Sequence, residues 1–277
     1  MEQRIFNIGS SVENAVMWLT EHFGSVFDVI KDNGNSLIEG FENLLLFFPF
    51  YVVIALFVAV AWYKGGKSVA LITGLGFLFI YSMGFWTETM QTLALVLIST
   101  VVALIIAIPL GIISAKKSSV EKSVRPILDL MQTMPAFVYL IPAVLFFSIG
   151  KLPGAFATII FAMPPAVRLT SLGIKEVSPE VVEAAKSFGA TPMQVLMKVE
   201  LPLAKNSLLA GVNQTIMMSL SMVVIAGMIA AGGLGEKVLE GINNLDIGLG
   251  FESGLAVVIL AIILDRITQS FAASKKK

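Results

Sequence analysis

Apolar runs long enough to cross a bilayer recur along this sequence from residue 44 onward. Of its 277 residues, 56% are hydrophobic and 14% are charged, whereas a soluble globular domain carries about 25% charged residues. In the hydrocarbon core every backbone polar group must be bonded within the protein, so such runs fold as helices. The sequence therefore predicts an all-α fold, a polytopic membrane helix bundle.

We count about seven spans in the sequence. They are expected at Leu44–Trp62, Val69–Trp86, Met90–Ser114, Ile127–Ile149, Leu152–Val167, Leu208–Ala231 and Ser253–Thr268. Proline lacks the backbone N–H that a helix needs, so Pro135 and Pro142 should interrupt the fourth span and Pro164-Pro165 should break the fifth. Broken helices occur in transporters, where a cavity or a neighbouring helix resatisfies the freed backbone groups.

Residues 1–43 are polar and contain no run that could span a bilayer. Apolar side chains recur there at three- and four-residue spacing, which predicts an N-terminal amphipathic helix. The stripe consists of Val12, Ala15, Val16, Leu19, Phe23, Val26, Phe27 and Ile30. Asp32-Asn33-Gly34-Asn35 should break this helix. We expect it either to lie on the membrane surface or to pack on the bundle or a partner.

A charged, hydrophilic stretch from Lys175 to Lys205 interrupts the apolar runs, and we call it the charged segment. It carries helix start and stop signals of its own. These are Ser178 before Pro179, Gly189 as a left-handed stop, Thr191 before Pro192 with Gln194 to complete a capping box, and Pro202 to end or kink the second helix. They predict two short helices joined by a tight turn at Gly189. Such helices are too short and too charged to cross a bilayer, so they should lie at the membrane face.

The order of residues within the charged segment resembles a known motif. Glu183-Ala184-Ala185, Gly189, Val199 and Leu201-Pro202 stand at the spacing of the EAA motif of ABC importer permeases, with valine at 199 where isoleucine is commoner. The resemblance implies that 177–203 is a coupling segment that docks into a groove on a separate ATP-binding subunit. The residues that it assigns to this docking are Glu183, Ala184, Ala185, Gly189, Leu201 and Pro202.

The resemblance extends over residues 88–269 and becomes more specific there. The stretches LDLMQTMPAFVYLIP (128–142), MPPAVRLTSLGI (163–174), AGVNQT (210–215), SMVVIAGMIAAGGLG (221–235), LDIG (245–248) and ILAIILDRITQ (259–269) carry it. They are similar to the permease subunit of glycine betaine/proline betaine ABC importers. On this basis the chain is divided into an extracytoplasmic N-terminal region (1–43), two extra spans (44–87), the importer transmembrane domain (88–269) and a cytoplasmic basic tail (270–277).

The family implies a type I importer with several separate subunits. Two permease copies, a homodimer in membrane lipid, would form the pathway, and two ATP-binding subunits would hold ATP and Mg²⁺. An extracytoplasmic binding protein would deliver the solute. The expected solute is glycine betaine, proline betaine or a related quaternary ammonium osmoprotectant; the alternative is another small solute such as choline, carnitine or an amino acid. The alternative classes of protein are an ion-coupled secondary transporter or channel and a membrane enzyme.

The basic residues indicate how the chain lies in the plasma membrane. If the charged segment is cytoplasmic, 15 of the 19 lysines and arginines fall in cytoplasmic loops or at the C-terminus. Cytoplasmic loops of membrane proteins carry such an excess. We therefore expect the N-terminus outside and the C-terminus in the cytoplasm. A formal net charge of zero gives no reason to expect nucleic acid as a partner.

Polar side chains at membrane depth are the remaining candidates for a pathway or a dimer interface. They are Asn213, Gln214, Thr215, Gln132 and Tyr139. With no cysteine and one histidine we expect no metal site and no thiol chemistry. Gly66-Lys67-Ser68 resembles the end of a phosphate-binding loop, but Ala61 stands where the motif needs glycine. The chain is therefore expected to bind no cofactor and to have no ATPase site of its own.

Overall fold

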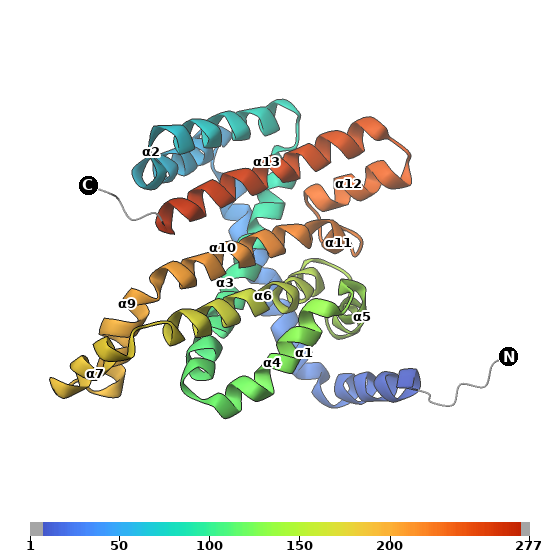
Figure 1. Cartoon of the computed structure of the whole chain (residues 1–277). Helices are drawn as coiled ribbons and strands as arrows, with labels where there is room; N and C mark the ends of the chain where they lie inside the picture. Colours follow the sequence, from blue (N-terminus) through green and yellow to red (C-terminus); the bar gives the residue numbers. More distant parts are fainter. Residues whose placement is uncertain (1–7, 273–277) are drawn as a thin grey trace.

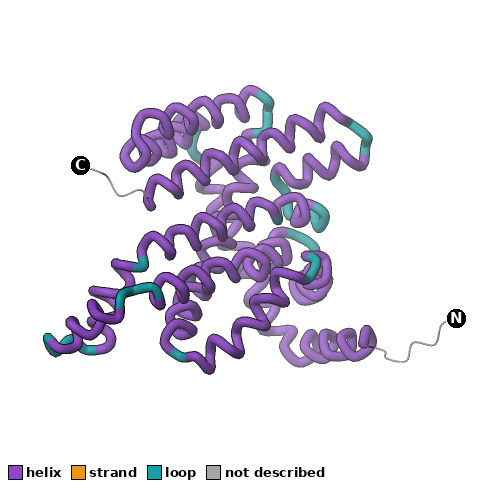
Figure 2. The backbone as a smooth tube through the Cα atoms, viewed as in Figure 1, coloured by secondary structure: helices purple, strands orange, loops and turns teal. Residues whose placement is uncertain are grey.

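The computed structural model describes residues 8–272 of the chain, all in helices and short connections with no strand in this part (Figures 1 and 2). The elements are α1 (Ile8–Phe47), α2 (Phe50–Ser82), α3 (Trp86–Lys116), α4 (Ser118–Thr133), α5 (Ala136–Phe147), α6 (Lys151–Lys175), α7 (Pro179–Ser187), α8 (Pro192–Val195), the π-helix η1 (Leu196–Glu200), α9 (Leu201–Leu203), α10 (Lys205–Ser221), α11 (Val223–Gly227), α12 (Leu234–Asn243) and α13 (Ile247–Ala272). The all-α prediction is confirmed. The last residues of the predicted basic tail lie outside the described residues.

Three long helices in mutual contact, α3, α6 and α10, form the centre of the bundle (Figure 1). Glycines allow these helices to approach closely. A Cβ at Gly111 of α3 would lie 2.7 Å from the Cβ of Thr170 on α6, and one at Gly211 of α10 would lie 3.2 Å from the Cα of Ala166. Membrane helices use small residues in this way because close backbone packing replaces the hydrophobic driving force between them.

The two ends of the bundle carry different connections (Figure 1). The charged segment and the end of α13 lie together at one end, which we call the segment end. The turns between α5 and α6, between α11 and α12, and between α12 and α13 lie at the opposite end, which we call the far end. The largest apolar core joins α2, α3, α12 and α13, where Phe77, Met90, Leu234, Leu260 and Ile263 are fully buried.

Five helices in the described part are long and apolar enough to cross a membrane, or six if α4 and α5 together form one span. The chain is therefore a multi-pass membrane protein. The five are α2, α3, α6, α10 together with α11, and α13. The prediction of about seven spans counted two within residues 44–87, where the structure has, after the end of α1, the element α2 with a non-helical break at Gly66. That total stays a prediction.

Helix α2 is folded back on itself at Gly66, which has φ +80°. Rings from its two halves meet: Phe50 stacks on Tyr81 with centroids 3.9 Å apart, and Phe57 lies 5.2 Å from Phe77. Residues 50–65 and 67–82 therefore form an antiparallel hairpin. Each half is about 24 Å long at 1.5 Å per residue, shorter than the ~30 Å hydrocarbon core of a typical bilayer. The predicted first span is displaced, because Pro49 ends α1 and starts α2 within it.

The predicted fourth span is two helices. Helices α4 and α5 meet at an angle of 96°, at the extended residue Met134 and Pro135. The break at Pro135 was predicted, since the residue before a proline avoids helical angles. The predicted interruption at Pro142 is not found, so that prediction was wrong: Pro142 lies inside α5. The prediction also missed the start of α4 at Ser118, in a stretch that was assigned to a loop.

The predicted break of the fifth span is also wrong. Helix α6 runs without interruption for 25 residues from Lys151 to Lys175, and Pro164 and Pro165 lie inside it. Both prolines are buried. A proline ring already has helical φ, and the tight packing of α3 and α10 on this part of α6 holds the helix together where backbone hydrogen bonds are missing.

Helix α1 continues through the residues that were expected to break it. The Asn33 side chain donates to the Val29 carbonyl oxygen at 2.7 Å, so it bonds within the helix rather than competing with it. At Gly34 the start of α6 approaches closely, since a Cβ there would lie 2.5 Å from Leu152 Cδ1. Gly34 is therefore a packing position, and α1 lies against α3, α5 and α6.

The far end contains one helix that the sequence did not predict as such. The predicted sixth span ends early, since α11 stops at Gly227 and the chain turns at Ala230 with φ +56°. Gly232 and Gly233 also have positive φ, and α12 then returns to pack along α13. Glycine allows these backbone angles at no steric cost. These glycines therefore reverse the direction of the chain after α11.

Candidate functional site

The charged segment begins with the predicted helical hairpin. Helix α7 has Pro179 at its first position, but the Ser178 hydroxyl makes no capping hydrogen bond, so that detail of the prediction was wrong. Gly189 has φ +80°. The Ala190 N–H donates to the Ala185 carbonyl oxygen at 3.1 Å, and the Gly189 N–H donates to that of Lys186 at 2.9 Å. These two bonds form a Schellman stop.

The second helix of the hairpin starts with the predicted capping box. The Gln194 N–H donates to Thr191 Oγ1 at 3.3 Å, and the Thr191 N–H donates to Gln194 Oε1 at 2.8 Å. The helix does not end at Pro202. It widens into the π-helix η1 before the proline, and the Leu201 N–H donates to the Leu196 carbonyl oxygen. A wider turn accommodates a ring that would clash with a carbonyl oxygen of a regular α-helix.

Most side chains of the hairpin are exposed, and several of them are apolar. No residue of α7 is buried; Glu183 and Ala184 are exposed and Ala185 is half-buried. Phe188 at the turn is 93% exposed. Other exposed apolar side chains of the segment are Val181, Met193, Met197 and Leu203. In Figure 1 the hairpin projects from the segment end of the bundle. An apolar surface of this kind indicates a protein interaction site.

An ion pair between a buried carboxylate and an exposed lysine ties the charged segment to the bundle. Glu200 at the end of η1 is 4% exposed, and its carboxylate binds the Lys116 ammonium at the end of α3. Of the two motif residues that follow, Leu201 is half-buried and Pro202 is exposed. Sequence reasoning missed Glu200, although an acidic side chain beside an apolar turn was a signal that a cation lies nearby.

The polar residues of the sixth span divide into three environments. Asn213 donates from Nδ2 to Asp265 Oδ1 at 3.0 Å and so joins α10 to α13. Thr215 is buried, and its hydroxyl donates to the Gly211 carbonyl oxygen at 2.9 Å within α10. Gln214 is exposed. Of these three residues, only Asn213 therefore has a side-chain hydrogen bond to another helix in the described part of the chain.

Gln132 and Tyr139 lie on α4 and α5, on either side of the 96° bend. Gln132 Oε1 accepts from Arg168 Nη1 at 2.5 Å, and Arg168 Nη2 donates to Asp129 Oδ1 at 2.6 Å. Tyr139 is buried beside Met222, and its hydroxyl has no hydrogen-bond partner among the described residues. Gln132 thus belongs to a polar cluster with Arg168 and Asp129, and Tyr139 belongs to an apolar cluster.

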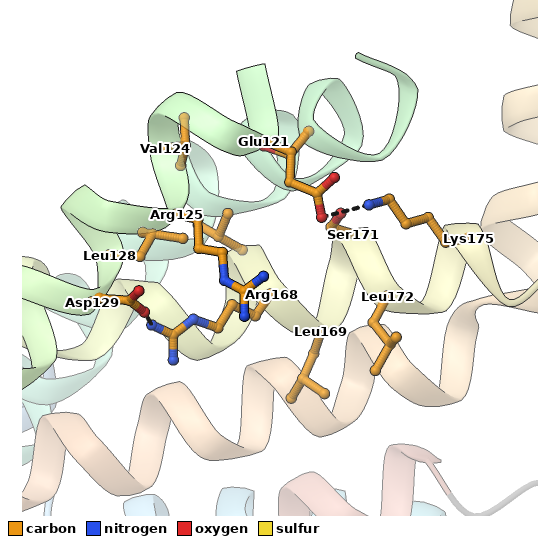
Figure 3. A pocket seen from close by; sticks show the side chains of 12 residues that line it. Glu121, Val124, Arg125, Leu128, Asp129, Arg168, Leu169, Ser171, Leu172 and Lys175 are labelled. Atoms are coloured by element: carbon orange, nitrogen blue, oxygen red, sulfur yellow. Dashed lines mark hydrogen bonds and ion pairs between the residues drawn. The ribbon is translucent and has the colours of Figure 1, made fainter. Parts of the chain in front are cut away.

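A pocket of about 410 Å³ lies beside this polar cluster, between the end of α3, α4 and α6 (Figure 3). Ion pairs cross it: Arg168 binds Asp129, and Lys175 Nζ lies 2.5 Å from Glu121 Oε1. Arg125 extends from α4 toward α6 (Figure 3). Among the described residues no group of three or more histidine, aspartate or glutamate side chains is placed to hold a metal ion.

A second polar network joins α1 to the far end of the bundle. Glu42 of α1 is 7% exposed, and its carboxylate accepts from Lys151 Nζ at 2.6 Å and from Gln91 Nε2 at 3.1 Å. Gln91 Oε1 in turn accepts from the Gly233 N–H at 3.0 Å. Nearby, Lys31 Nζ donates to Ser148 Oγ at 3.0 Å. Helix α1 therefore contacts the α5–α6 connection directly and is linked to the α11–α12 connection through Gln91.

Residues 107–276 match the family described as the binding-protein-dependent transport system inner membrane component. The chain belongs to this family. The relatives of this permease include the glycine betaine transport system permease protein OpuAB of Bacillus subtilis, 48% identical over 96% of this chain and 94% of that protein. The glycine betaine/carnitine transport permease protein GbuB of Listeria monocytogenes is 50% identical over 97% of this chain and 96% of its own length.

Another relative is the glycine betaine/proline betaine transport system permease protein ProW of Escherichia coli, 48% identical over 95% of this chain and 74% of that protein. Among solved structures, a chain of the MetNI methionine ABC transporter in an inward-facing conformation has the same fold. Its TM-score is 0.61 at 22% sequence identity, and the match covers 66% of this permease and 91% of that chain. The predicted kinship with betaine permeases and the importer-type fold are confirmed.

Proposed function

We propose that this permease forms the membrane pathway of an ATP-driven importer for glycine betaine, proline betaine or a related quaternary ammonium solute. The observation that carries the proposal is the near full-length identity of 48–50% to permeases named for glycine betaine transport. Relatives named for carnitine or choline transport without glycine betaine are more distant, at 28% identity over 64% of this chain. Choline and an amino acid are therefore less favoured, whereas carnitine stays an alternative because GbuB, named for glycine betaine and carnitine, is 50% identical.

The exposed hairpin of the charged segment supports a role in coupling. In this proposal 177–203 docks on an ATP-binding subunit, with Glu183, Ala184, Ala185 and Gly189 on the docking helix and its turn. Leu201 and Pro202 link that helix to α10. ATP-driven closure of two such subunits moves the two hairpins, and the Lys116–Glu200 ion pair passes part of the motion to α3. The pathway alternates between outward and inward access.

The remaining subunits and the orientation are part of the same proposal. The permease works as a homodimer with an extracytoplasmic binding protein, and ATP and Mg²⁺ are bound by the ATP-binding subunits. The segment end is cytoplasmic and the far end, with α1, is extracytoplasmic. The end of α13 lies at the segment end, in keeping with a cytoplasmic C-terminus (Figure 1). Asn213, Gln214 and Gln132 stay candidates for the pathway or the dimer interface.

Reconstituted transport tests the proposal directly. The permease is placed in proteoliposomes with its candidate ATP-binding and binding-protein subunits, and uptake of labelled glycine betaine is measured with and without ATP while ion gradients are collapsed. We expect uptake only with ATP and both partners. Uptake by the permease alone, driven by an ion gradient, would overturn the proposal in favour of a secondary transporter. ATP-driven uptake of a different solute would keep the importer and reject the betaine assignment.

A further inference from the structure

The pocket between α3, α4 and α6 has more positive than negative groups to satisfy. Three cationic side chains line it, Arg125, Arg168 and Lys175, together with two carboxylates, Glu121 and Asp129. Arg168 is paired with Asp129, and Lys175 is paired with Glu121. Arg125 makes no ion pair and no hydrogen bond with a described residue. One positive charge is therefore left over, and Arg125 carries it.

Two buried hydroxyls at the same pocket also lack partners. Ser114 at the end of α3 is 3% exposed and Ser171 of α6 is 7% exposed, and both line the pocket. Neither hydroxyl makes a hydrogen bond within the described part of the chain. Serines inside helices commonly bond to a carbonyl oxygen one turn earlier, as Ser123 and Ser187 do here. Most buried polar atoms in proteins have a partner, so these two hydroxyls indicate a missing one.

We propose that this pocket binds the carboxylate of a small zwitterionic solute at the cytoplasmic end of the pathway, which rests on the transport function proposed above. Arg125, which is exposed, binds the carboxylate, and the buried hydroxyls of Ser114 and Ser171 donate to it when their side chains turn toward the pocket. A guanidinium and two hydroxyl donors match one singly charged oxyanion. Asp129, whose side chain is 56% exposed, lies beside the cationic end of the solute.

The composition of the pocket favours a zwitterion over other anionic ligands. The two carboxylates of the lining already neutralise Arg168 and Lys175, so the one remaining positive charge matches a singly charged carboxylate better than a doubly charged phosphate. They also distinguish the pocket from anionic-lipid sites, which are clusters of basic residues. No aromatic side chain lines the pocket, so it lacks the cation–π cage that binds quaternary ammonium groups tightly. Weak binding suits a site from which solute is released.

The chain has no cysteine, which allows a test by site-directed labelling. S171C places a single thiol in the pocket, and S114C is a second probe in case the first variant folds poorly. Labelling by N-ethylmaleimide is measured on the purified permease–ATPase complex in nanodiscs, with glycine betaine, with choline or without solute. We expect glycine betaine to slow labelling of S171C several-fold. Choline has the quaternary ammonium group but no carboxylate, and we expect it to leave the rate unchanged.

Matched variants test whether the protection by glycine betaine arises at the pocket. S123C lies on the exposed face of α4, and solute should not change its labelling rate. R125Q in the S171C chain should abolish protection by glycine betaine, whereas K122Q, three residues away and outside the pocket lining, should preserve it. The same preparations are tested for ATP-driven uptake. If the wild-type complex takes up solute but neither thiol is protected, the proposed solute site in the pocket is rejected and the proposed transport function stands. If the wild-type complex takes up no solute, the proposed transport function is rejected.

Two further outcomes would also overturn the proposal. Equal protection by choline and glycine betaine would mean that the pocket does not recognise a carboxylate. A labelling rate that follows the fraction of anionic lipid in the nanodisc and ignores glycine betaine would make the pocket a lipid headgroup site. Protection that requires glycine betaine and Arg125 together is the result that supports it.

Discussion

Gly189 ends α7 with a backbone angle that favours glycine, φ +80°. A Cβ there would meet no atom within 4 Å, so a substitution is opposed by the backbone angle rather than by a clash. The left-handed angle costs an L-residue about 1–2 kcal/mol, and more for a β-branched one. We expect G189V to abolish ATP-driven uptake while membrane insertion stays normal.

Asparagine tolerates left-handed angles, so G189N is the matched control and should retain most of the uptake. Membrane insertion of both variants is measured by fractionation, and uptake in proteoliposomes. Uptake by G189V at the wild-type rate would show that the turn is not needed for coupling.

Glu183 is exposed on α7, and among the described residues its carboxylate has no partner. Its charge is therefore available to another subunit. We predict that E183K weakens docking of the ATP-binding subunit, because the substitution reverses a charge at the proposed interface. Co-purification of the two subunits at graded salt concentrations measures the effect. E180K reverses a charge in the first turn of the same helix and is the control; equal retention of the ATP-binding subunit by wild type and E183K would remove Glu183 from the interface.

At the residue scale, local signals were reliable where local chemistry decides the structure. The capping box of Thr191 and Gln194 and the stop at Gly189 formed as predicted, since they involve neighbours in sequence. Glu200 and Glu42 were missed because their partners, Lys116 and Lys151, are 84 and 109 residues away along the chain. A carboxylate in an apolar stretch signals that a cation lies nearby, but no pattern within one segment indicates which cation it is.

At the scale of elements, the contact of α1 with α6 and α3 depends on a buried carboxylate. K151M removes the cation that faces Glu42 and leaves that charge in an apolar setting. We expect a loss of about 1–3 kcal/mol in stability, less than for a fully buried pair because Lys151 is partly exposed. E42Q keeps a hydrogen-bonding side chain and should cost less.

A double-mutant cycle of E42Q and K151M, followed by thermal unfolding in detergent, measures the coupling between the two side chains. The interaction energy between the two side chains should be well above the experimental error of the cycle. Strict additivity of the two substitutions would mean that the ion pair does not join α1 to the bundle.

Elements that are apolar throughout were predicted well, and elements that depend on tertiary packing were not. The predicted third span, Met90–Ser114, lies within α3, and the seventh, Ser253–Thr268, lies within α13. Pro164 and Pro165 predicted a break in α6 that close packing by α3 and α10 prevents. Helix α12 was missed for two reasons. Its 10 residues are too few to cross a bilayer, and the helix on which it packs, α13, comes after it in the chain.

At the scale of the whole molecule, the two ends of α1 contribute unequally to stability. Residues 9–23 are mostly exposed, whereas Ile38, Glu42 and Leu45 are buried against the bundle. We expect deletion of residues 1–20 to leave the apparent unfolding temperature nearly unchanged. Deletion of residues 1–47 should lower it strongly and reduce uptake, because it removes the partners of Gln91 and Lys151.

Unfolding is followed by the fluorescence of the tryptophans that both truncated chains retain, in detergent and at matched protein concentration. A full-length unfolding temperature for the longer deletion would mean that α1 adds nothing to the stability of the bundle.

The overall class of the molecule could be predicted from composition and charge, and its arrangement could not. Apolar runs and the charged segment predicted a helical membrane protein with one exposed helical hairpin. The fold of α2 back on itself at Gly66 and the right-angled break before Pro135 depend on contacts between distant segments. Those contacts also create the pocket beside Arg125.

The π-helix η1 sets the rotational phase between the hairpin and α10. A π turn holds one residue more than the α-helical turn it replaces, and each residue of an α-helix adds 100° of rotation and 1.5 Å of rise. If η1 regularised to α-helical turns with all 5 of its residues kept, the extra residue would rotate the face of the hairpin that carries Glu183 by about 100°. Loss of one residue between 196 and 200 would instead remove the extra residue, and the helix could regularise with the hairpin facing in its present direction. The π turn therefore keeps the hairpin in register with α10 in a chain that is one residue longer there than a regular helix requires.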